Sequence, residues 1–294
     1  MNQKHKFLLL LKKKKKKKGN NVIVKPCNTV PTVSKLMGDL LHKYMSPYFV
    51  QVIGTPDGIP DDRECTHQIL QNKFDLIFFT GSTNGGRYVM SQAAKFLTPV
   101  ILELGGKNPV IVDSTANLAL AAKQIMYARV INCGQQCISP DYILCEKKAV
   151  DELTEQFCTL CVYIDVMSLN VANRLKLYAE KFFSEDYVED TNQCKLVNDV
   201  QFERVKNMLD SSKGKVISGG KCDSKTRKFQ PTIVRCDLSD PGLEQETFGP
   251  IVWVVSVDDI KIAVEYINRY ALEIQKKKKK TKTKKNLLFV IPSF

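Results

Sequence analysis

The stretch DLIFFTGSTNGGRYVMSQAAKF, residues 75–96, joins a short apolar run to a glycine-containing turn and then to a helical pattern. The run DLIFFTG (75–81) has the length and composition of a buried strand. The segment after it begins with Ser82, a residue type that caps helices, and has apolar residues spaced for one helical face: Val89, Ala93 and Phe96. A strand followed directly by a helix is the unit from which parallel α/β sheets are built.

The same alternation of strand and helix continues in both directions from this unit. Apolar runs bounded by Gly, Pro or Asp predict strands within 21–26, 48–60, 98–106, 108–113, 141–147, 215–220, 230–236 and 249–257. Helical spacing predicts helices at 33–45, 62–74, 116–132, 148–163, 201–210 and 258–270, with a polar region that runs to about residue 198. This pattern favours an α/β fold with parallel sheets and right-handed crossover connections.

Length and cysteine content indicate the kind of protein. The chain has 294 residues, enough for one large domain or two ordinary ones without disulfides, and its ten cysteines show no regular spacing. We therefore expect reduced cysteines and a cytoplasmic location. The longest apolar runs fall well short of the roughly 20 residues of a membrane span, so we expect no transmembrane anchor.

The net charge of +13 comes from two lysine runs. Lys12–Lys18 supply seven positive charges, and lysines between residues 276 and 285 supply eight more. Removing these fifteen charges from +13 leaves −2, so the rest of the chain is close to neutral. Polylysine cannot bury apolar surface and repels itself, which predicts that both runs are disordered. The runs could bind nucleic acid through its phosphates, but solvated tails are the preferred interpretation.

A cysteine-containing turn is a candidate nucleophile site. The segment VINCGQQCISPDYILCEK (130–147) places Cys137 after a predicted helix end, with Cys133 one helical turn earlier. A cysteine attacks at neutral pH when nearby dipoles or cations lower its pKa. His42 and His67 lie far away in sequence and in no motif for a Cys–His dyad, which counts against a cysteine protease. Taken alone, this motif favours a packing cysteine over a nucleophile.

Three other motifs contain residues that could take part in chemistry. FTGSTNGG (79–86) puts a glycine-containing turn at a helix N-terminus, where a phosphate can bind, but it lacks the three-glycine dinucleotide spacing, so taken alone it favours an ordinary tight turn. LELGGK (102–107) places Glu103 at the end of an apolar strand. If buried, Glu103 would have a raised pKa that suits a general base, but it could equally reach solvent. CTLC (158–161) has metal-ligand spacing, yet no second pair or histidine completes a site, so we expect helical core and no metal site.

Taken together, the motifs resemble the aldehyde dehydrogenase superfamily, specifically its class 3 and fatty aldehyde dehydrogenase branch. Four segments occur in the family's order and at about its spacing: FTGSTNGG, KFLTPVILELGGKNPVIVD, NCGQQCISPDYILCEK and QETFGPIVWVVSVDD. The resemblance covers about residues 19–270. It implies an aldehyde dehydrogenase-like α/β fold, in which a Rossmann-type parallel sheet binds the cofactor and a second α/β domain carries the catalytic cysteine.

The resemblance also implies a role for each matching residue. Cys137 would attack the aldehyde carbonyl, and Glu103 would activate water to release the acid. Six residues would contact NAD or NADP: Lys25, Gly81, Ser82, Gly86, Glu246 and Phe248. Cys133 would be a spectator. Asn28 replaces an acid that often faces the adenosine ribose, so we expect NADP to be tolerated relative to NAD.

The resemblance further implies domain boundaries. We expect a Lys-rich disordered segment at 1–18, a partial NAD(P)-binding domain at 19–104, a catalytic domain at 105–270 that is incomplete at its C-terminus, and a Lys-rich tail at 271–294. Compared with the family, the chain is expected to be truncated at both ends. The family's oxyanion-holding asparagine has no convincing counterpart, because Asn2 lacks that residue's aromatic and proline neighbours.

These features leave three functional readings. The first is NAD(P)-dependent oxidation of a small-molecule aldehyde through Cys137, impaired by truncation, in a homodimer of the kind that relatives form. The second is an inactive fragment that retains partial nucleotide binding. The third, least favoured, is nucleic-acid binding through the lysine runs.

Overall fold

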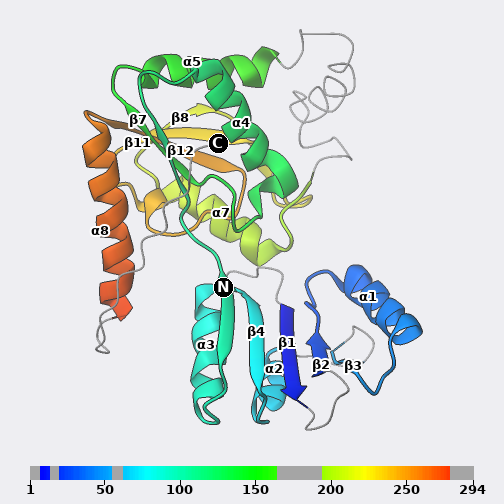
Figure 1. Ribbon diagram of the computed structural model, residues 1–294. Helices are drawn as coiled ribbons and strands as arrows, with labels where there is room; N and C mark the ends of the chain where they lie inside the picture. Colours follow the sequence, from blue (N-terminus) through cyan, green and yellow to red (C-terminus); the bar gives the residue numbers. More distant parts are fainter. Residues whose placement is uncertain (1–6, 14–19, 55–61, 164–193, 279–294) are drawn as a thin grey trace.

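The computed structural model describes residues 7–13, 20–54, 62–163 and 194–278, which are built around two five-stranded sheets (Figure 1). Sheet A has the order β3-β2-β1-β4-β5 and consists of β1 Phe7–Lys13, β2 Asn20–Lys25, β3 Val50–Val52, β4 Leu76–Gly81 and β5 Val100–Leu104. Sheet B has the order β6-β7-β12-β11-β8 and consists of β6 Pro109–Val112, β7 Tyr142–Glu146, β8 Lys215–Ser218, β11 Thr232–Cys236 and β12 Ile251–Val257. A two-stranded ribbon joins β9 Cys222–Asp223 to β10 Lys228–Phe229.

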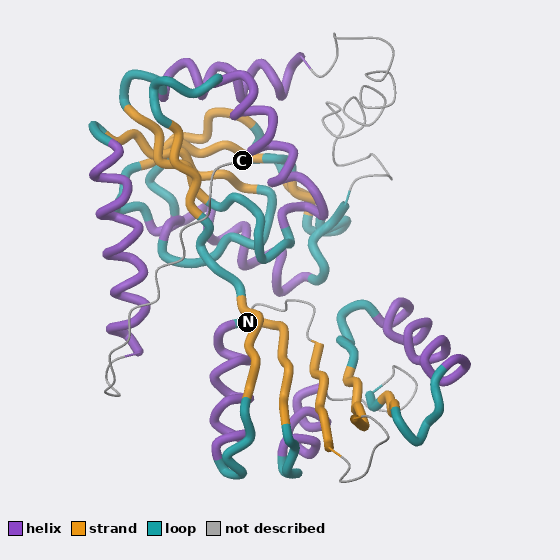
Figure 2. Tube along the Cα trace, in the orientation of Figure 1, coloured by secondary structure: helices purple, strands orange, loops and turns teal. Residues whose placement is uncertain are grey.

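The helices divide between the two sheets, as the trace in Figure 2 shows. Those of the sheet A lobe are α1 Pro31–Tyr44, α2 Asp62–Leu70 and α3 Thr83–Ala94. Those of the sheet B lobe are α4 Leu118–Val130, α5 Val150–Tyr163, α7 Asp199–Ser211 and α8 Ile260–Lys278, with 3₁₀ turns η1 Ile131–Gly134 and η2 Pro241–Leu243. The chain passes from sheet A to sheet B between Leu104 and Pro109.

Sheet B is covered on both faces. On one face, α4 and α5 pack on alternate strand residues that include Ile143, Cys145 and Val254. On the other, α7 and α8 pack on the intervening residues, among them Leu144 and Trp253. Strand residues buried on both faces read as continuous apolar runs, which is why YILC and IVWVV were recognisable as strands.

Sheet A has its buried core on one face. There α2 and α3 enclose Ile77 and Phe79 of β4. The burial pattern of β4 alternates between buried and half-buried residues, and that of β5 alternates between half-buried and exposed ones. Helix α1 packs beside the short edge strand β3, against which it places the small residues Ser34 and Gly38.

The prediction of a disordered segment at 1–18 is wrong for residues 7–13. These residues form β1, which occupies the centre of sheet A and pairs antiparallel with both β2 and β4. A parallel neighbour would need a crossover connection of a dozen or more residues, whereas residues 14–19 allow only a hairpin. The rest of this segment lies outside the described residues.

The second lysine run also differs from its prediction. Helix α8 begins at Ile260 and continues through Lys278, so Lys276–Lys278 are helical rather than disordered. A helix that is already nucleated adds residues at little cost, and lysine has a good helix propensity. Lysines beyond 278 lie outside the described residues.

The other expected strands and helices are present within a few residues of their predicted bounds. Sheet B is parallel except at its edge, where β8 runs antiparallel to β11. No helix among the described residues has the length and apolar character needed to cross a bilayer.

Candidate active site

Cys137 follows a backbone segment with an unusual conformation. After α4 the chain turns through η1, in which Asn132, Cys133 and Gly134 all have positive φ. A Cβ on Gly134, whose φ is +68°, would lie 2.2 Å from the carbonyl oxygen of Gly249, so only glycine fits this close approach. Cys133, predicted to be a spectator, is buried in the core of sheet B.

Gln135 anchors this turn from inside. Its Nε2 donates to the carbonyl oxygens of Asn132 at 3.0 Å and Lys195 at 3.1 Å, and its Oε1 accepts from the backbone N–H of Val197 at 3.0 Å. The buried side chain of Gln135 therefore ties the turn to the segment that enters α7.

The Cys137 thiol itself is exposed, and Asn108 holds its backbone. The side-chain amide of Asn108 donates to the carbonyl oxygens of Cys137 at 2.8 Å and Ser139 at 3.0 Å. Among the described residues, no hydrogen-bond acceptor meets the backbone N–H of Cys137. An exposed thiol beside a free N–H can place a carbonyl carbon against sulfur and its oxygen against a donor.

A buried cluster of charges lies next to this turn. Lys107 Nζ is 2.8 Å from Asp141 Oδ1, and their side chains are 2% and 1% exposed. Arg129 Nη2 is 4.0 Å from the same oxygen, and Arg129 Nη1 donates to the carbonyl oxygen of Pro140 at 2.8 Å. Burial lowers the pKa of Lys107, an effect that Asp141 opposes. Burial alone would raise the pKa of Asp141, but Lys107 and Arg129 together hold it below its ordinary value.

Asp141 also fixes the segment ETFGP that the family resemblance assigns to the cofactor. It accepts from the backbone N–H of Thr247 at 2.8 Å and from its hydroxyl, to which Trp253 Nε1 donates at 2.9 Å. Phe248, next in the chain, is buried and has a φ of +45°. A non-glycine residue is held in that region only where its surroundings determine it, as this network does.

Glu103 lies at the carboxyl end of β5, and the structure decides between its two interpretations. Its side chain belongs to the exposed set of this strand, with Ile101. The burial that would have favoured a general base is therefore missing, and the solvent-reaching glutamate is observed.

The start of α3 follows β4 directly. Ser82 caps the helix, as predicted, because its Oγ accepts from the N–H of Gly85 at 3.1 Å. A Cβ on Gly81 would lie 2.6 Å from the ring of Phe79, and one on Gly86 would lie 2.8 Å from Leu104 Cδ2. Gly81 thus leaves room for the ring of Phe79 in its own strand, and Gly86 lets the helix approach β5 closely. The N-terminus of α3 points beyond the carboxyl edge of sheet A, where α/β folds bind ligands.

Lys25 is the last residue of β2, and Asn28 lies between β2 and α1. Lys25 is only 2% exposed, and its Nζ donates to the carbonyl oxygen of Pro26 at 3.2 Å. The side-chain Oδ1 of Asn28 is buried without a hydrogen-bond partner. A buried acceptor of this kind is a place for a donor, such as a ligand hydroxyl.

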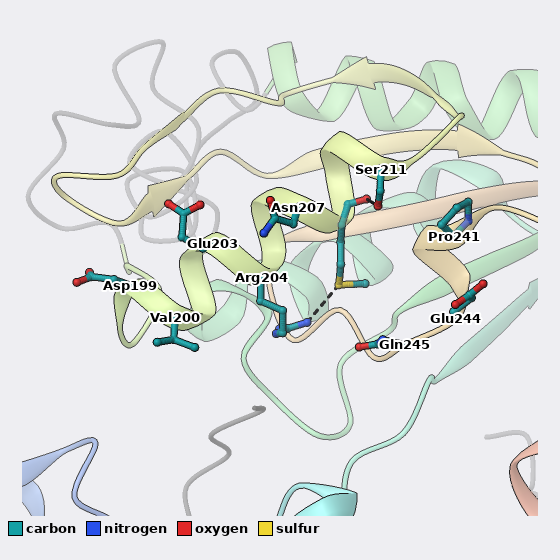
Figure 3. Close-up of a pocket in the computed structure, with 10 residues that line it drawn as sticks. Asp199, Val200, Glu203, Arg204, Asn207, Ser211, Pro241, Glu244 and Gln245 are labelled. Carbon is teal, nitrogen blue, oxygen red and sulfur yellow. Dashed lines mark hydrogen bonds between the residues drawn. The ribbon is translucent and has the colours of Figure 1, made fainter. Parts of the chain in front are cut away.

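Glu246 follows Gln245, which lines a groove of about 720 Å³ between α7 and η2; Figure 3 shows the lining residues. Arg204 extends from α7 and donates to the carbonyl oxygens of Glu246 at 3.2 Å and Thr247 at 2.6 Å. Burial lowers the pKa of Arg204 to about 10, against the opposing effect of Glu246. The ETFGP segment is thus held from both sides, by Asp141 and by Arg204.

Sequence reasoning missed Lys107, Asn108, Asp141 and Arg204. The sequence offers little indication of their role, because a polar or charged residue beside an apolar run is usually a surface residue at the end of a strand. Asp141 between Pro140 and the buried strand β7 was the one hint available. Within the described ranges, no group of three or more His, Cys, Asp or Glu side chains could hold a metal ion.

Comparison with known proteins identifies the family of this chain. The sequence profile of the Aldehyde dehydrogenase family matches residues 17–273. Mouse "Aldehyde dehydrogenase, dimeric NADP-preferring" is 36% identical over 249 residues, which are 84% of this chain and 49% of that protein. Human "Aldehyde dehydrogenase family 3 member B1" is 34% identical over 250 residues, 84% of this chain and 48% of that protein.

Solved structures show the same likeness. The substrate-bound state of Staphylococcus aureus AldH superposes with a TM-score of 0.70 at 28% identity, covering 84% of this chain and 49% of that one. The chain therefore spans about half the length of the relatives that it matches. With a family profile that covers most of its residues, the chain belongs to the aldehyde dehydrogenase family.

Proposed function

We propose that this chain carries the catalytic cysteine and part of the cofactor site of an enzyme that oxidises aldehydes to carboxylic acids with NAD or NADP. The observation that carries the proposal is the exposed Cys137 in a backbone turn anchored by Gln135 and Asn108, with an N–H free of partners among the described residues. A cysteine kept only for packing would be buried, as Cys133 is.

The residues present fit a dinucleotide cofactor in two places. The N-terminus of α3 offers a helix start for a pyrophosphate, through Gly81, Ser82 and Gly86. The partnerless Oδ1 of Asn28 could accept from a ribose hydroxyl. By family resemblance, Lys25, Glu246 and Phe248 would complete the site. When bound, the nicotinamide supplies the acceptor for the hydride that leaves the substrate carbon.

Cys137 provides the nucleophile for this chemistry. Its thiolate attacks the aldehyde carbonyl carbon and forms a thiohemiacetal, while the Cys137 N–H donates to the developing oxyanion. Oxidation of that adduct leaves a thioester on sulfur. Glu103 then takes a proton from water, which attacks the thioester carbon and releases the acid and the free thiol. The exposure of Glu103 gives it access to that water.

The direct test is reduced-cofactor formation, followed at 340 nm with a medium-chain or aromatic aldehyde. We expect Cys137→Ala to abolish turnover, and Cys194→Ala, which removes another exposed cysteine, to retain it. Glu103→Gln should form about one equivalent of reduced cofactor and then stall, because the thioester is not hydrolysed. Turnover that survives Cys137→Ala would refute the proposal.

A folded protein that binds NAD or NADP but oxidises no aldehyde would support the alternative of an inactive nucleotide-binding fragment. The position of Asn28 supports a second proposal, that NADP is accepted. A binding titration with NAD and NADP tests this second proposal. An affinity for NADP at least 100-fold weaker than that for NAD would contradict it.

A further inference from the structure

The turn that carries Cys137 has few backbone hydrogen bonds of its own. The N–H of Gln135 donates to the carbonyl oxygen of Asn132 at 3.1 Å, and that of Ser139 donates to Gln136 at 3.2 Å. Both bonds are local, so they shape the turn without fixing it to the sheet. The position of the thiol must therefore depend on side chains that reach the turn from elsewhere.

Asn108 is the side chain that reaches Cys137 itself. Its amide nitrogen donates to the carbonyl oxygens of Cys137 and Ser139. Its own backbone carbonyl accepts from the N–H of Asp141 at 2.9 Å and of Tyr142 at 3.3 Å. Among the described residues, no other side chain hydrogen-bonds to Cys137. One residue thus holds the chain from the nucleophile to the first residue of β7.

The place of Asn108 in the fold makes it a rigid support. It directly precedes β6, whose parallel pairing with β7 fixes its backbone. It also directly follows Lys107, whose buried ion pair with Asp141 joins the same two segments a second time. A shift of Asn108 would have to break both the strand pairing and this ion pair.

The chemistry of the side chain is specific. A primary amide has two N–H donors on one nitrogen, so it can serve two carbonyl oxygens at once. A serine at this position could donate to only one of them. An ionised aspartate has no donor and would place negative charge against two carbonyl oxygens.

We propose that Asn108 is a positioning residue for Cys137, which it holds at the geometry of attack through the carbonyl groups of residues 137 and 139. The inference rests on the proposed function of Cys137 as nucleophile. It predicts an effect on the rate of chemistry rather than on binding, because Asn108 supports the reacting atom and contacts the substrate in no step. Misplacement of a reacting group by about 1 Å can cost roughly 100-fold in rate.

The experiment compares Asn108→Ser, Asn108→Ala and Asn108→Asp in the full chain. We expect kcat to fall about 10- to 100-fold in the Ala and Asp variants, and less in the Ser variant, with KM for aldehyde and Kd for NAD unchanged. Amide hydrogen exchange should accelerate within residues 137–142 in the same variants. A higher kcat in Asn108→Ser than in Asn108→Ala would show that the loss of activity comes from missing hydrogen-bond donors rather than from a general loss of fold.

Asn117→Ala is the matched control. Asn117 caps α4 in the same lobe through its Oδ1, which accepts from the N–H of Leu120 at 3.0 Å, and it lies outside the candidate site. Its loss should lower Tm without changing kcat or the exchange of residues 137–142.

The outcomes separate this inference from the proposed function. Cys137-dependent turnover that is unchanged in Asn108→Ala overturns the positioning role alone. If the wild-type chain shows no such turnover, the proposed function fails, and hydrogen exchange decides whether Asn108 holds the turn. Exchange in Asn108→Ala that equals that of Asn117→Ala overturns the inference in either case.

Discussion

The two lobes of this protein use the same alternation of strands and helices but reach different degrees of burial. In sheet B, all residues of β12 except Ser256 are buried, because helices cover both faces. In sheet A, β5 has no fully buried residue, and the one buried core lies on the side of α2 and α3. A shared pattern of elements thus does not imply an equally complete core.

The difference begins at the centre of sheet A. Its strand order matches that of a doubly wound nucleotide-binding sheet, yet β1 runs antiparallel to both neighbours. The chain between β1, which ends at Lys13, and β2, which begins at Asn20, is too short for the crossover connection that a parallel pair would need. Among the described residues, the sheet A lobe has three helices and the sheet B lobe has four.

Helix α1 shows the same incomplete burial in the sheet A lobe. Its apolar stripe faces solvent, with Leu36 57% exposed, while Ser34 and Gly38 face the strands. The stripe lines an apolar groove made of Val33, Leu36, Met37, Leu40, Leu41, Tyr44 and Met45. The candidate nucleophile lies in the well-buried lobe, and the α3 helix start in the open one, so damage to each lobe should have separate effects.

The largest expected effect comes from Asp141→Ala in the sheet B lobe. The change leaves Lys107 and Arg129 as uncompensated buried charges, which should cost about 3–5 kcal/mol of unfolding free energy. Denaturant unfolding, followed by the fluorescence of the single tryptophan, Trp253, measures this loss of stability in the lobe that contains Asp141.

The same ion cluster predicts a pH dependence. The pKa of Asp141 is lower in the folded state. Its contribution is therefore present above the unfolded pKa of about 3.9 and is lost as pH falls through the folded value. Asp141→Asn should flatten this acid limb, and an unchanged acid limb would show that other carboxylates control it.

Shortening one apolar side chain in each lobe directly tests the difference in burial between the two sheets. Leu153 of α5 is 0% exposed, so Leu153→Ala should cost about 2–5 kcal/mol through lost burial and a cavity. Ile101 of β5 is 44% exposed, and Ile101→Ala should cost less than about 1 kcal/mol. Denaturant midpoints of the two variants provide the measurement. Equal losses would mean that sheet A is as well covered in solution as sheet B.

Two glycines give a smaller contrast. A Cβ on Gly242 would lie 2.4 Å from the ring of the fully buried Trp253, so Gly242→Ala should cost about 1–3 kcal/mol. A Cβ on Gly86 would meet the side chain of Leu104, which is half-buried and can move. A helix gains about 1 kcal/mol from alanine, so Gly86→Ala should be close to neutral in thermal unfolding. A large loss there would indicate a rigid sheet A.

The smallest effect is expected on α1. Leu36→Lys should change the unfolding free energy by no more than about 0.5 kcal/mol, because the side chain is already exposed. It should nevertheless reduce binding of an apolar fluorescent dye, since it interrupts the groove of α1. A clear loss of stability would show that something covers this helix in solution.

Much of the fold follows from local sequence alone. The apolar runs and helical spacing predicted the strands and helices of both lobes, and Ser82 was recognised as a cap, because these features depend on neighbouring residues. The motif order also identified the family. The candidate nucleophile was named by resemblance, since an isolated cysteine after a helix end does not distinguish chemistry from packing.

Other features depend on contacts between distant segments, and only the tertiary structure decided them. Lys12 and Lys13 joined a strand because they continue β1, which β4 pairs through Leu11, and because β2 pairs with both lysines. Glu103 lies on the exposed face of β5, and the apolar stripe of α1 is exposed, because no described element packs over either of them. Asn108 and Asp141 became parts of the site when β6 paired with β7, an event that joins residues far apart in the chain.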